Sequence, residues 1–203
     1  MYASMHSDGR PSTNHSAEET FDGRSLEPHI ASIATILADT GAQTLLDFGS
    51  GKGKLYENDT ETPDVRRKRL RAWGDVKVSC YDPGYEPYAG PIEGPFDAVI
   101  STDVVEHIPA EDIPWLLDEL FGYAKACVYI VAACYPANKL LPDGSNAHCT
   151  IQSPRWWSAQ MRAASDRRNG PKWTLCAQEK SYFSFEQRSR IYKPGLRTHY
   201  FNG

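Results

Sequence analysis

The sequence predicts an α/β protein whose mostly parallel sheet has helices on both faces and closes with an antiparallel hairpin. Two apolar runs, Thr44–Phe48 and Phe96–Thr102, each end in polar residues, as buried parallel strands do. Segments with helical periodicity alternate with these runs. Near the end of the chain, Lys172–Ala177 and Tyr182–Tyr192 have the pattern of two strands joined tightly at Glu179-Lys180. This order of elements is typical of a doubly wound, Rossmann-like sheet.

The length and composition fit one globular domain. The chain has 203 residues, which suffice for a single substantial core. Residues 1–22 are polar without an apolar period, so we expect a flexible arm there and a single domain over 23–203. A net charge of −4 gives no general attraction to nucleic acid or to anionic membranes. The five cysteines form no CxxC pair and no apolar run reaches 18 residues, so we expect a cytoplasmic protein without a membrane span.

Four helices and two further strands are expected between these landmarks. The expected helices run from about Ser25 to the cap Gly41, from about Lys54, over Ile113–Ala124, and from Ser153 onward; the further strands are Val76–Tyr81 and Cys127–Cys134. The segment from Pro83 to Pro95 holds four prolines and three glycines. Because this composition opposes regular structure, we expect the third strand of the sheet to be short or missing.

The strand Thr44–Phe48 leads into three glycines at alternate positions. Gly49, Gly51 and Gly53 follow Asp47, which stands two residues before the first of them. Glycine supplies positive φ angles and lets the backbone approach a ligand closely. A Walker P-loop is excluded, because Phe48 stands at its first position and Leu55 follows the lysine. A dinucleotide fingerprint is also excluded, because the third glycine comes one residue early.

Two motifs resemble those of a known family. The Asp-x-Gly-x-Gly-x-Gly spacing resembles the first motif of class I S-adenosylmethionine (SAM) dependent methyltransferases. The stretch FDAVISTDVVEHIP, which begins at Phe96, resembles the fourth-strand motif of small-molecule members of that family. The resemblance covers roughly residues 22 to 195. It implies the class I methyltransferase fold, SAM as methyl donor and S-adenosylhomocysteine as product. It also implies a set of cofactor-binding residues, namely Asp47, Gly49, Ser50, Gly51, Gly53, Asp82, Pro83 and Asp103.

Asp82 is our choice for the carboxylate that holds the cofactor ribose. It follows the expected second strand, and one carboxylate can accept hydrogen bonds from both the 2′- and 3′-hydroxyls. It lies 29 positions after Gly53, more than the usual spacing of about 20. An insertion over Pro63–Trp73 accounts for the extra length. Asp75 is nearer, but it would stand at the head of the strand and therefore at the wrong edge of the sheet.

Two histidines are candidates for the base that removes a proton from the acceptor. His148 lies in the expected loop after the strand Cys127–Cys134, and a structural hydrogen-bonding role for it is about equally favoured. His107 follows the fourth-strand motif, where a loop-stabilising role is favoured. Asp103, Glu106 and His107 together offer ligands for a divalent cation. However, adjacent residues diverge by about 100° on a helix, so the sequence assigns no metal ligand.

Two motifs of DNA methyltransferases are missing from the sequence, which narrows the class of acceptor. The sequence has neither the Asn/Asp-Pro-Pro-Tyr/Phe segment of exocyclic-amino DNA methylases nor the Pro-Cys pair of cytosine-C5 enzymes. A small-molecule or sugar-like acceptor, methylated on oxygen or nitrogen, is therefore expected. Trp156, Trp157 and Tyr135 are candidates for the wall of its pocket.

Two alternatives remain open. One is a non-catalytic SAM-binding or scaffold protein. The other is a nucleic-acid methyltransferase that uses the basic cluster Arg66–Arg71 to grip phosphates. A solvated helix face is the favoured reading of this cluster, since the chain is acidic overall. The sequence leaves the oligomeric state open.

Overall fold

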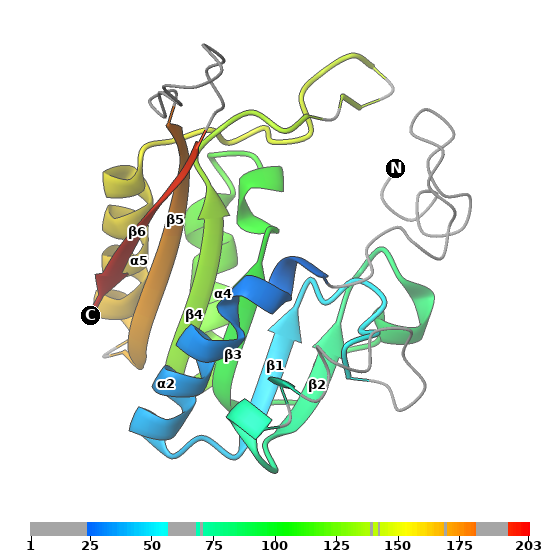
Figure 1. Cartoon of the computed structure of the whole chain (residues 1–203), viewed down its shortest axis with the longest axis vertical. Coiled ribbons are helices and arrows are strands. Elements are labelled where there is room, and N and C mark those ends of the chain that lie inside the picture. Colours follow the sequence, from blue (N-terminus) through cyan, green and yellow to red (C-terminus); the bar gives the residue numbers. More distant parts are fainter. Residues whose placement is uncertain are drawn as a thin grey trace, which may run out of the picture.

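The structure, a computed structural model, describes residues 24–56, 68–69, 71–138, 140–141, 143–168, 170–181 and 195–203. These residues form a six-stranded sheet in the order β2-β1-β3-β4-β5-β6 (Figure 1). The strands are β1 (Thr44–Phe48), β2 (Lys77–Tyr81), β3 (Phe96–Thr102), β4 (Ala124–Ala133), β5 (Lys172–Ser181) and β6 (Gly195–Asn202). The first five are parallel, and β6 runs antiparallel to β5. The predicted arm over residues 1–22 lies outside the described residues.

Helices precede, connect and follow these strands. The α-helices are α2 (Ile30–Thr40), α4 (Ile113–Tyr123) and α5 (Pro154–Arg167), and the 3-10 turns are η2 (Arg24–His29), η3 (Glu86–Tyr88) and η4 (Val105–His107). Helix α2 ends at Gly41, whose φ of 65° is the left-handed cap predicted there. Helix α5 begins at the predicted Ser153, whose hydroxyl accepts the N–H of Trp156 over 3.2 Å.

The sheet buries a separate core on each face. Along β4, Val128 and Ile130 pack with α4 and α5, whereas Tyr129 and Val131 pack with α2. This alternation with a period of two explains why the strand reads as a continuous apolar run. Helices therefore cover both faces, as Figure 1 shows. The predicted fold class, a doubly wound and mostly parallel α/β sheet with a C-terminal antiparallel strand, is confirmed.

The turn predicted at Glu179-Lys180 is wrong, although the expected antiparallel pair is formed by β5 and β6. Strand β5 continues through both residues, and they pair with Arg197 and Leu196 of β6. Their polar side chains suggested a turn, but each is satisfied on the strand. The carboxylate of Glu179 lies 2.8 Å from His199 Nε2, and the ammonium of Lys180 donates to the side-chain oxygen of Asn138 over 3.2 Å. The predicted strand Tyr182–Tyr192 lies outside the described residues.

Two expectations concern the segments that follow β1 and β2. No strand forms over residues 82–95, where η3 is the regular element, so the missing third strand is confirmed. The helix expected from Lys54 is not formed over 54–56, which are turns; residues 57–67 lie outside the described residues, and 68–69 and 71–73 are helical. Among the helices that the structure describes, none combines the length and the apolar character needed to cross a bilayer.

Candidate functional site

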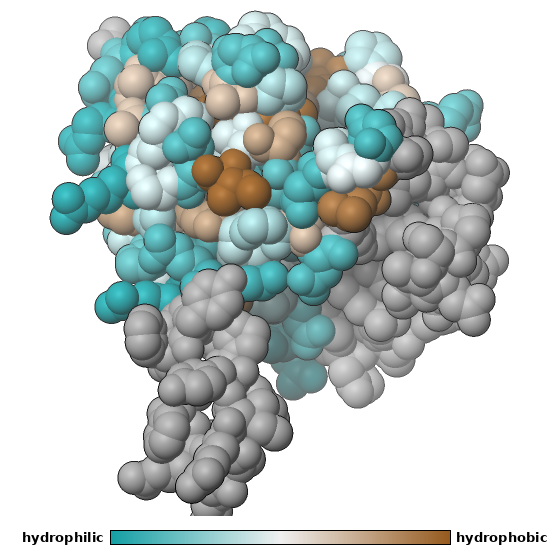
Figure 2. All heavy atoms as spheres, turned by 90° about the horizontal axis from the view of Figure 1, so that it is seen from above, coloured by the Kyte–Doolittle hydropathy of each residue, from teal (hydrophilic) through white to brown (hydrophobic). Residues whose placement is uncertain are grey.

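The predicted site residues gather at the carboxyl ends of the parallel strands. Strands β1, β3 and β4 point upward in Figure 1, and the glycine loop, Asp82 and Asp103 follow β1, β2 and β3. Figure 2 looks down on this end of the molecule, where the coloured surface is mostly hydrophilic with scattered hydrophobic residues. Open α/β sheets bind their ligands at this edge, where strand ends present polar groups and loops.

The glycine loop needs glycine at all three of its alternate positions. Gly49, Gly51 and Gly53 have φ angles of 80°, 59° and 60°, in the left-handed region that other residues rarely adopt. The space for a side chain at Gly49 and Gly53 is also restricted. A Cβ on Gly49 would overlap the side chain of Val104, and one on Gly53 would lie 2.9 Å from the ring of Tyr88. The conformation of the turn after β1 therefore depends on all three glycines, and its packing depends on Gly49 and Gly53.

Hydrogen bonds fasten this loop to the end of β2. The carbonyl oxygen of Tyr81 accepts the N–H groups of Gly49 and Ser50, over 2.7 and 3.1 Å. The carboxylate of Asp82 accepts the N–H of Gly51 with one oxygen and the N–H of Gly84 with the other, each over 2.8 Å. Asp82 is partly exposed, and a carboxylate oxygen can accept more than one hydrogen bond. Its carboxylate therefore shapes the loop and also stands at the strand end that the sequence assigns to ribose.

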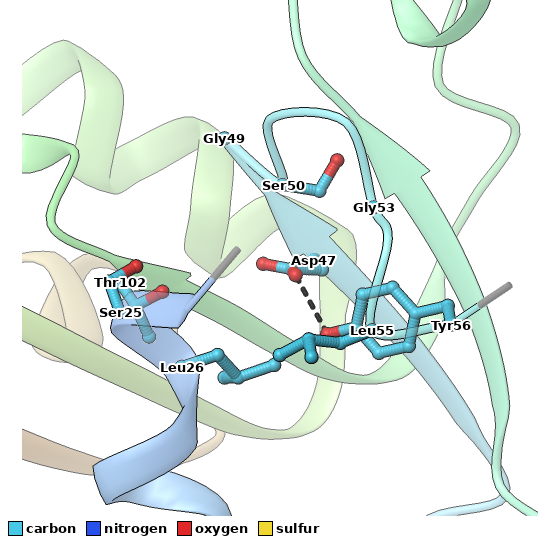
Figure 3. Close-up of a pocket in the computed structure, with 9 residues that line it drawn as sticks. All are labelled: Ser25, Leu26, Asp47, Gly49, Ser50, Gly53, Leu55, Tyr56 and Thr102. Carbon is cyan, nitrogen blue, oxygen red and sulfur yellow. Dashed lines mark hydrogen bonds between the residues drawn. The ribbon is translucent and has the colours of Figure 1, made fainter. Parts of the chain in front are cut away.

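A pocket lies under the loop (Figure 3). The space between its lining atoms amounts to about 250 Å³, open solvent included, and about 10 Å³ of it is wide enough for the centre of a water molecule. Its lining combines the loop with the end of β3 and the segment before α2, through Ser25, Leu26, Asp47, Gly49, Ser50, Gly53, Leu55, Tyr56 and Thr102. The accessible space in the pocket thus holds about one water molecule, and a larger ligand group would require the lining side chains to move.

Asp47 is the most unusual residue of this pocket. It is only 4% exposed, and Figure 3 shows it at the centre of the lining residues. Its Oδ2 accepts the hydroxyl of Tyr56 over 2.7 Å, while its Oδ1 is buried without a hydrogen-bond partner among the described residues. Burial, and to a smaller extent Asp82, raises the pKa of Asp47 to about 7, against the opposing effect of the Tyr56 hydroxyl. A cationic group entering the pocket would satisfy this carboxylate.

The predicted basic cluster, Arg66–Arg71, is partly buried. Arg66 and Arg67 lie outside the described residues, and Lys68 and Arg71 are exposed. Arg69 is only 5% exposed; its guanidinium lies 5.0 Å from the ring centre of Tyr56, and its Nε donates to the carbonyl oxygen of Leu55. The favoured expectation of a solvated helix face is therefore wrong for Arg69. Its side chain packs against Tyr56, which lines the pocket.

A second polar cluster follows β3. Glu106, which is completely buried, accepts the N–H of Ala133 with Oε1 over 3.2 Å, and its Oε2 has no hydrogen-bond partner among the described residues. His148 Nε2 lies 4.0 Å from Glu106 Oε1. The rings of His107 and His148 meet edge to face, with their centroids 4.9 Å apart. The structure thus brings together His107 and His148, the two candidate bases predicted from the sequence, and places Glu106 beside His148.

Both rings of this cluster are held by backbone carbonyls. His107 Nδ1 lies 2.7 Å from the carbonyl oxygen of Ala147, and His148 Nδ1 lies 2.7 Å from that of Tyr135. A carbonyl oxygen only accepts, so each Nδ1 carries a proton, and the neutral ring keeps its lone pair on Nε2. The contact with Ala147 is the loop-stabilising role expected for His107.

Burial sets the charge of the cluster. It lowers the pKa of His148, an effect that the Tyr135 carbonyl opposes, so the ring is neutral near pH 7. Burial, followed by the charge of Asp103, raises the pKa of Glu106 to about 8. Burial by surrounding protein also raises the pKa of Asp103, although its side chain keeps contact with solvent. The cluster therefore has low net charge and can accept a proton or a cation.

Some predicted site residues lie elsewhere, and some lining residues were not predicted. Trp157, a candidate pocket wall, is 1% exposed and belongs to the core against α4. Tyr135 does flank His148, with ring centroids 5.9 Å apart, and Pro83 is exposed in the turn after β2. Ser25 and Leu26 reach the pocket from a segment whose sequence shows only the apolar period of a helix.

Comparison with known proteins gives a distant structural likeness. No protein-family model matches the chain, and no curated protein matches its sequence. Among solved structures, the mitomycin 7-O-methyltransferase MmcR matches with a TM-score of 0.41 and 13% sequence identity. The match covers 93% of this chain but only 45% of that one, so the chain spans less than half the length of this structure.

Proposed function

We propose that the protein is a methyltransferase that transfers the methyl group of SAM to an oxygen or nitrogen of a small-molecule or sugar-like acceptor. The observation that carries this proposal is Asp47, a buried carboxylate with an oxygen left unpartnered among the described residues, beneath a loop of three left-handed glycines. An unpaired buried carboxylate is costly, and such groups cluster at sites where a ligand pairs with them.

The residues around the loop fit the two polar ends of SAM. The ammonium of its amino-acid part would pair with Asp47, and the ribose hydroxyls would donate to Asp82 at the end of β2. Gly49, Ser50, Gly51 and Gly53 would give the backbone its close approach, with Pro83 and Asp103 on either side. SAM supplies a methyl group that its sulfonium activates for displacement. The main contribution of the protein would be to hold acceptor and methyl group in line.

The histidine cluster would serve the acceptor. A neutral His148 with its lone pair on Nε2 can take a proton from a hydroxyl or amine, and Glu106 in its ionised form would stabilise the ring once the ring is charged. His107, edge to face against His148, would keep that ring in place. Since both rings are anchored through Nδ1, their reactive edges are preorganised.

The test begins with binding. Calorimetry of the wild-type chain with SAM and with S-adenosylhomocysteine should show saturable binding, and Asp47→Asn should weaken it at least tenfold, about 1.4 kcal/mol. Incubation with metabolite extract and isotopically labelled SAM should then label an acceptor. Absence of binding to both compounds would refute the proposal. Binding without labelled product across acceptor classes would instead identify a SAM-binding scaffold.

A nucleic-acid acceptor receives less support from the geometry. Arg69 is used inside the protein, which removes one cation from the surface that would grip phosphates. Reversing the charges of Arg66 and Arg67 tests this alternative directly. Unchanged affinity for RNA and DNA in the double variant is expected if the acceptor is a small molecule, whereas a large, salt-dependent loss would favour nucleic acid.

A further inference from the structure

We propose that Glu106, His107 and His148 form a binding site for one divalent transition-metal ion. The three residues each offer a ligand atom, and these atoms lie within 4.8 Å of one another. Glu106 and His107 come from η4 directly after β3, and His148 comes from the loop that precedes α5. This inference needs only these side chains, but it uses the Nε2 lone pair of His148, so an ion bound there would replace the role of that ring as a base in the proposed methyl transfer.

The distances between the three ligand atoms are close to those that a metal ion requires. The centre of an equilateral triangle with 4.8 Å sides lies about 2.8 Å from each corner, and Zn–N bonds are about 2.0–2.1 Å long. The pair between His148 Nε2 and Glu106 Oε1 is already tighter, at 4.0 Å. Each side chain would move by roughly 0.7 Å or less to reach bonding distance, which is within the range of small rotamer adjustments.

The histidines are oriented as metal ligands usually are. In metal sites the second ring nitrogen typically donates to a carbonyl or carboxylate, which fixes the tautomer and the direction of the ring. Here Ala147 and Tyr135 supply these carbonyls, each 2.7 Å from an Nδ1. The lone pair of each ring is therefore on Nε2, the nitrogen that approaches Glu106 in His148.

The loop that carries His148 is braced against η4. The N–H of Thr150 donates to the carbonyl oxygen of Glu106 over 3.0 Å, and its hydroxyl donates to the carbonyl oxygen of Ile108 over 2.6 Å. These bonds hold together two parts of the chain that are far apart in sequence. The three ligands are thus assembled by backbone contacts before any ion arrives.

Glu106 provides a second, independent indication. It is completely buried, and its Oε2 has no hydrogen-bond partner among the residues the structure describes. A buried carboxylate oxygen without a partner costs about 1–3 kcal/mol, more when it is charged. A cation held between this carboxylate and the two imidazoles would remove that cost.

The donor set selects the kind of ion. Two imidazole nitrogens and one carboxylate oxygen suit Zn²⁺, Fe²⁺, Co²⁺ or Mn²⁺, whereas Mg²⁺ and Ca²⁺ prefer oxygen ligands throughout. Three protein ligands leave at least one coordination position for water or a ligand oxygen. The site differs from the sequence expectation of no metal ligand because η4 is a single 3-10 turn and His148 supplies the third group.

Direct metal binding tests the proposal. Untagged, chelator-treated wild-type protein should bind a single Co²⁺ per chain with visible d–d absorption, and Zn²⁺ should compete for it. His148→Ala and the isosteric Glu106→Gln should each weaken binding at least about tenfold. His199→Ala is the matched control, since His199 also pairs with a glutamate, Glu179, over 2.8 Å but on β6. It should bind Co²⁺ like the wild type.

A measurement on the wild type guards against variants that fail to fold. X-ray absorption of the Zn²⁺-loaded protein should show two imidazole ligands in the first coordination shell. No saturable Co²⁺ binding, or a Zn²⁺ ion without two imidazoles, would overturn the proposal. Equal loss of binding in His199→Ala and His148→Ala would overturn it as well, because the ion would then lie elsewhere.

Discussion

The backbone N–H of Gly51 donates to Oδ2 of Asp82 over 2.8 Å, which joins the glycine loop after β1 to the end of β2. The other oxygen of the same carboxylate accepts the N–H of Gly84 over 2.8 Å. A residue assigned to the ribose from sequence thus also maintains the shape of the loop. Substitutions at Asp82 should therefore affect stability and ligand affinity together.

Asp82→Ala should reduce SAM affinity at least tenfold, about 1.4 kcal/mol, because it removes the ribose acceptor and releases two loop N–H groups. It should also lower the melting temperature of the protein without ligand. Calorimetry and thermal unfolding measure the two effects. Asp75→Ala is the matched control, since Asp75 is exposed and precedes β2 at the opposite edge of the sheet. Wild-type affinity in Asp82→Ala would show that the ribose lies elsewhere.

Gly49→Ala should destabilise the protein more than Gly41→Ala. Both glycines have positive φ, so each substitution carries a conformational cost of about 1 kcal/mol. A Cβ at Gly41 has nothing within 4 Å, whereas one at Gly49 overlaps Val104, which should add roughly 1–3 kcal/mol. Denaturant unfolding measures the difference.

Val104→Ala supplies the double-mutant test of this overlap. Combined with Gly49→Ala, it should recover part of the added cost, because the smaller side chain makes room for the new Cβ. Strict additivity of the two single effects would contradict the steric explanation. The Gly49 variants should also bind SAM less well, because the loop shape would change.

Asp47→Asn should stabilise the protein at neutral to alkaline pH while weakening its affinity for SAM. Burial raises the pKa of Asp47 to about 7 in the folded state from an ordinary value of 3.8. The folded state therefore holds this proton more tightly than the unfolded state does. Its contribution to stability falls as the pH rises from about 4 to about 7 and stays low above that. Asp47→Asn should lack this slope and gain roughly 1–3 kcal/mol at pH 8.

Unfolding free energies measured from pH 4 to pH 8 check this prediction. The same ionisation should appear in binding, since an ammonium group pairs with the carboxylate and not with the carboxylic acid. Wild-type SAM affinity should therefore fall as the pH drops below about 7. Identical pH profiles for wild type and Asp47→Asn would show that Asp47 is ionised without penalty.

Arg69→Ala should lower the free energy of unfolding by roughly 2 kcal/mol or more, since it removes a buried side chain that stacks on Tyr56 and Trp73 and donates to Leu55. The neighbouring Lys68→Ala should change stability by less than about 0.5 kcal/mol, because Lys68 is exposed. Chemical denaturation measures the free energy of unfolding of both variants. Equal effects would mean that Arg69 is not part of the packed interior.

Much of the fold and of the glycine loop after β1 could be predicted from the sequence, because the residues that determine their conformation act locally. The apolar runs of β1 and β3, the cap at Gly41 and the proline-rich segment before β3 depend on periodicity, φ preference and missing N–H groups, which single residues dictate. The three positive φ angles of the glycine loop belong to the same class. Asp47 was found through its spacing from these glycines.

The errors and omissions concern contacts between distant segments. Glu179 and Lys180 resemble turn residues in isolation, but partners on β6 and in the loop after β4 let the strand continue. Arg69 belongs to a basic run, and only the positions of Tyr56 and Trp73 make it internal. The approach of His148 to Glu106 depends on bonds between two loops, which no local pattern encodes.

Asp103 is the only non-glycine residue with a positive φ among the described residues, at 56°. Glycine would adopt this angle without steric cost, and so Asp103→Gly would make the bend after β3 easier to form. The chain instead places a carboxylate there, beside the buried acid Glu106, whose ionisation it disfavours. The bend after β3 thus carries two unfavourable features, the left-handed backbone of Asp103 and its charge beside Glu106, and such features are typical of functional sites.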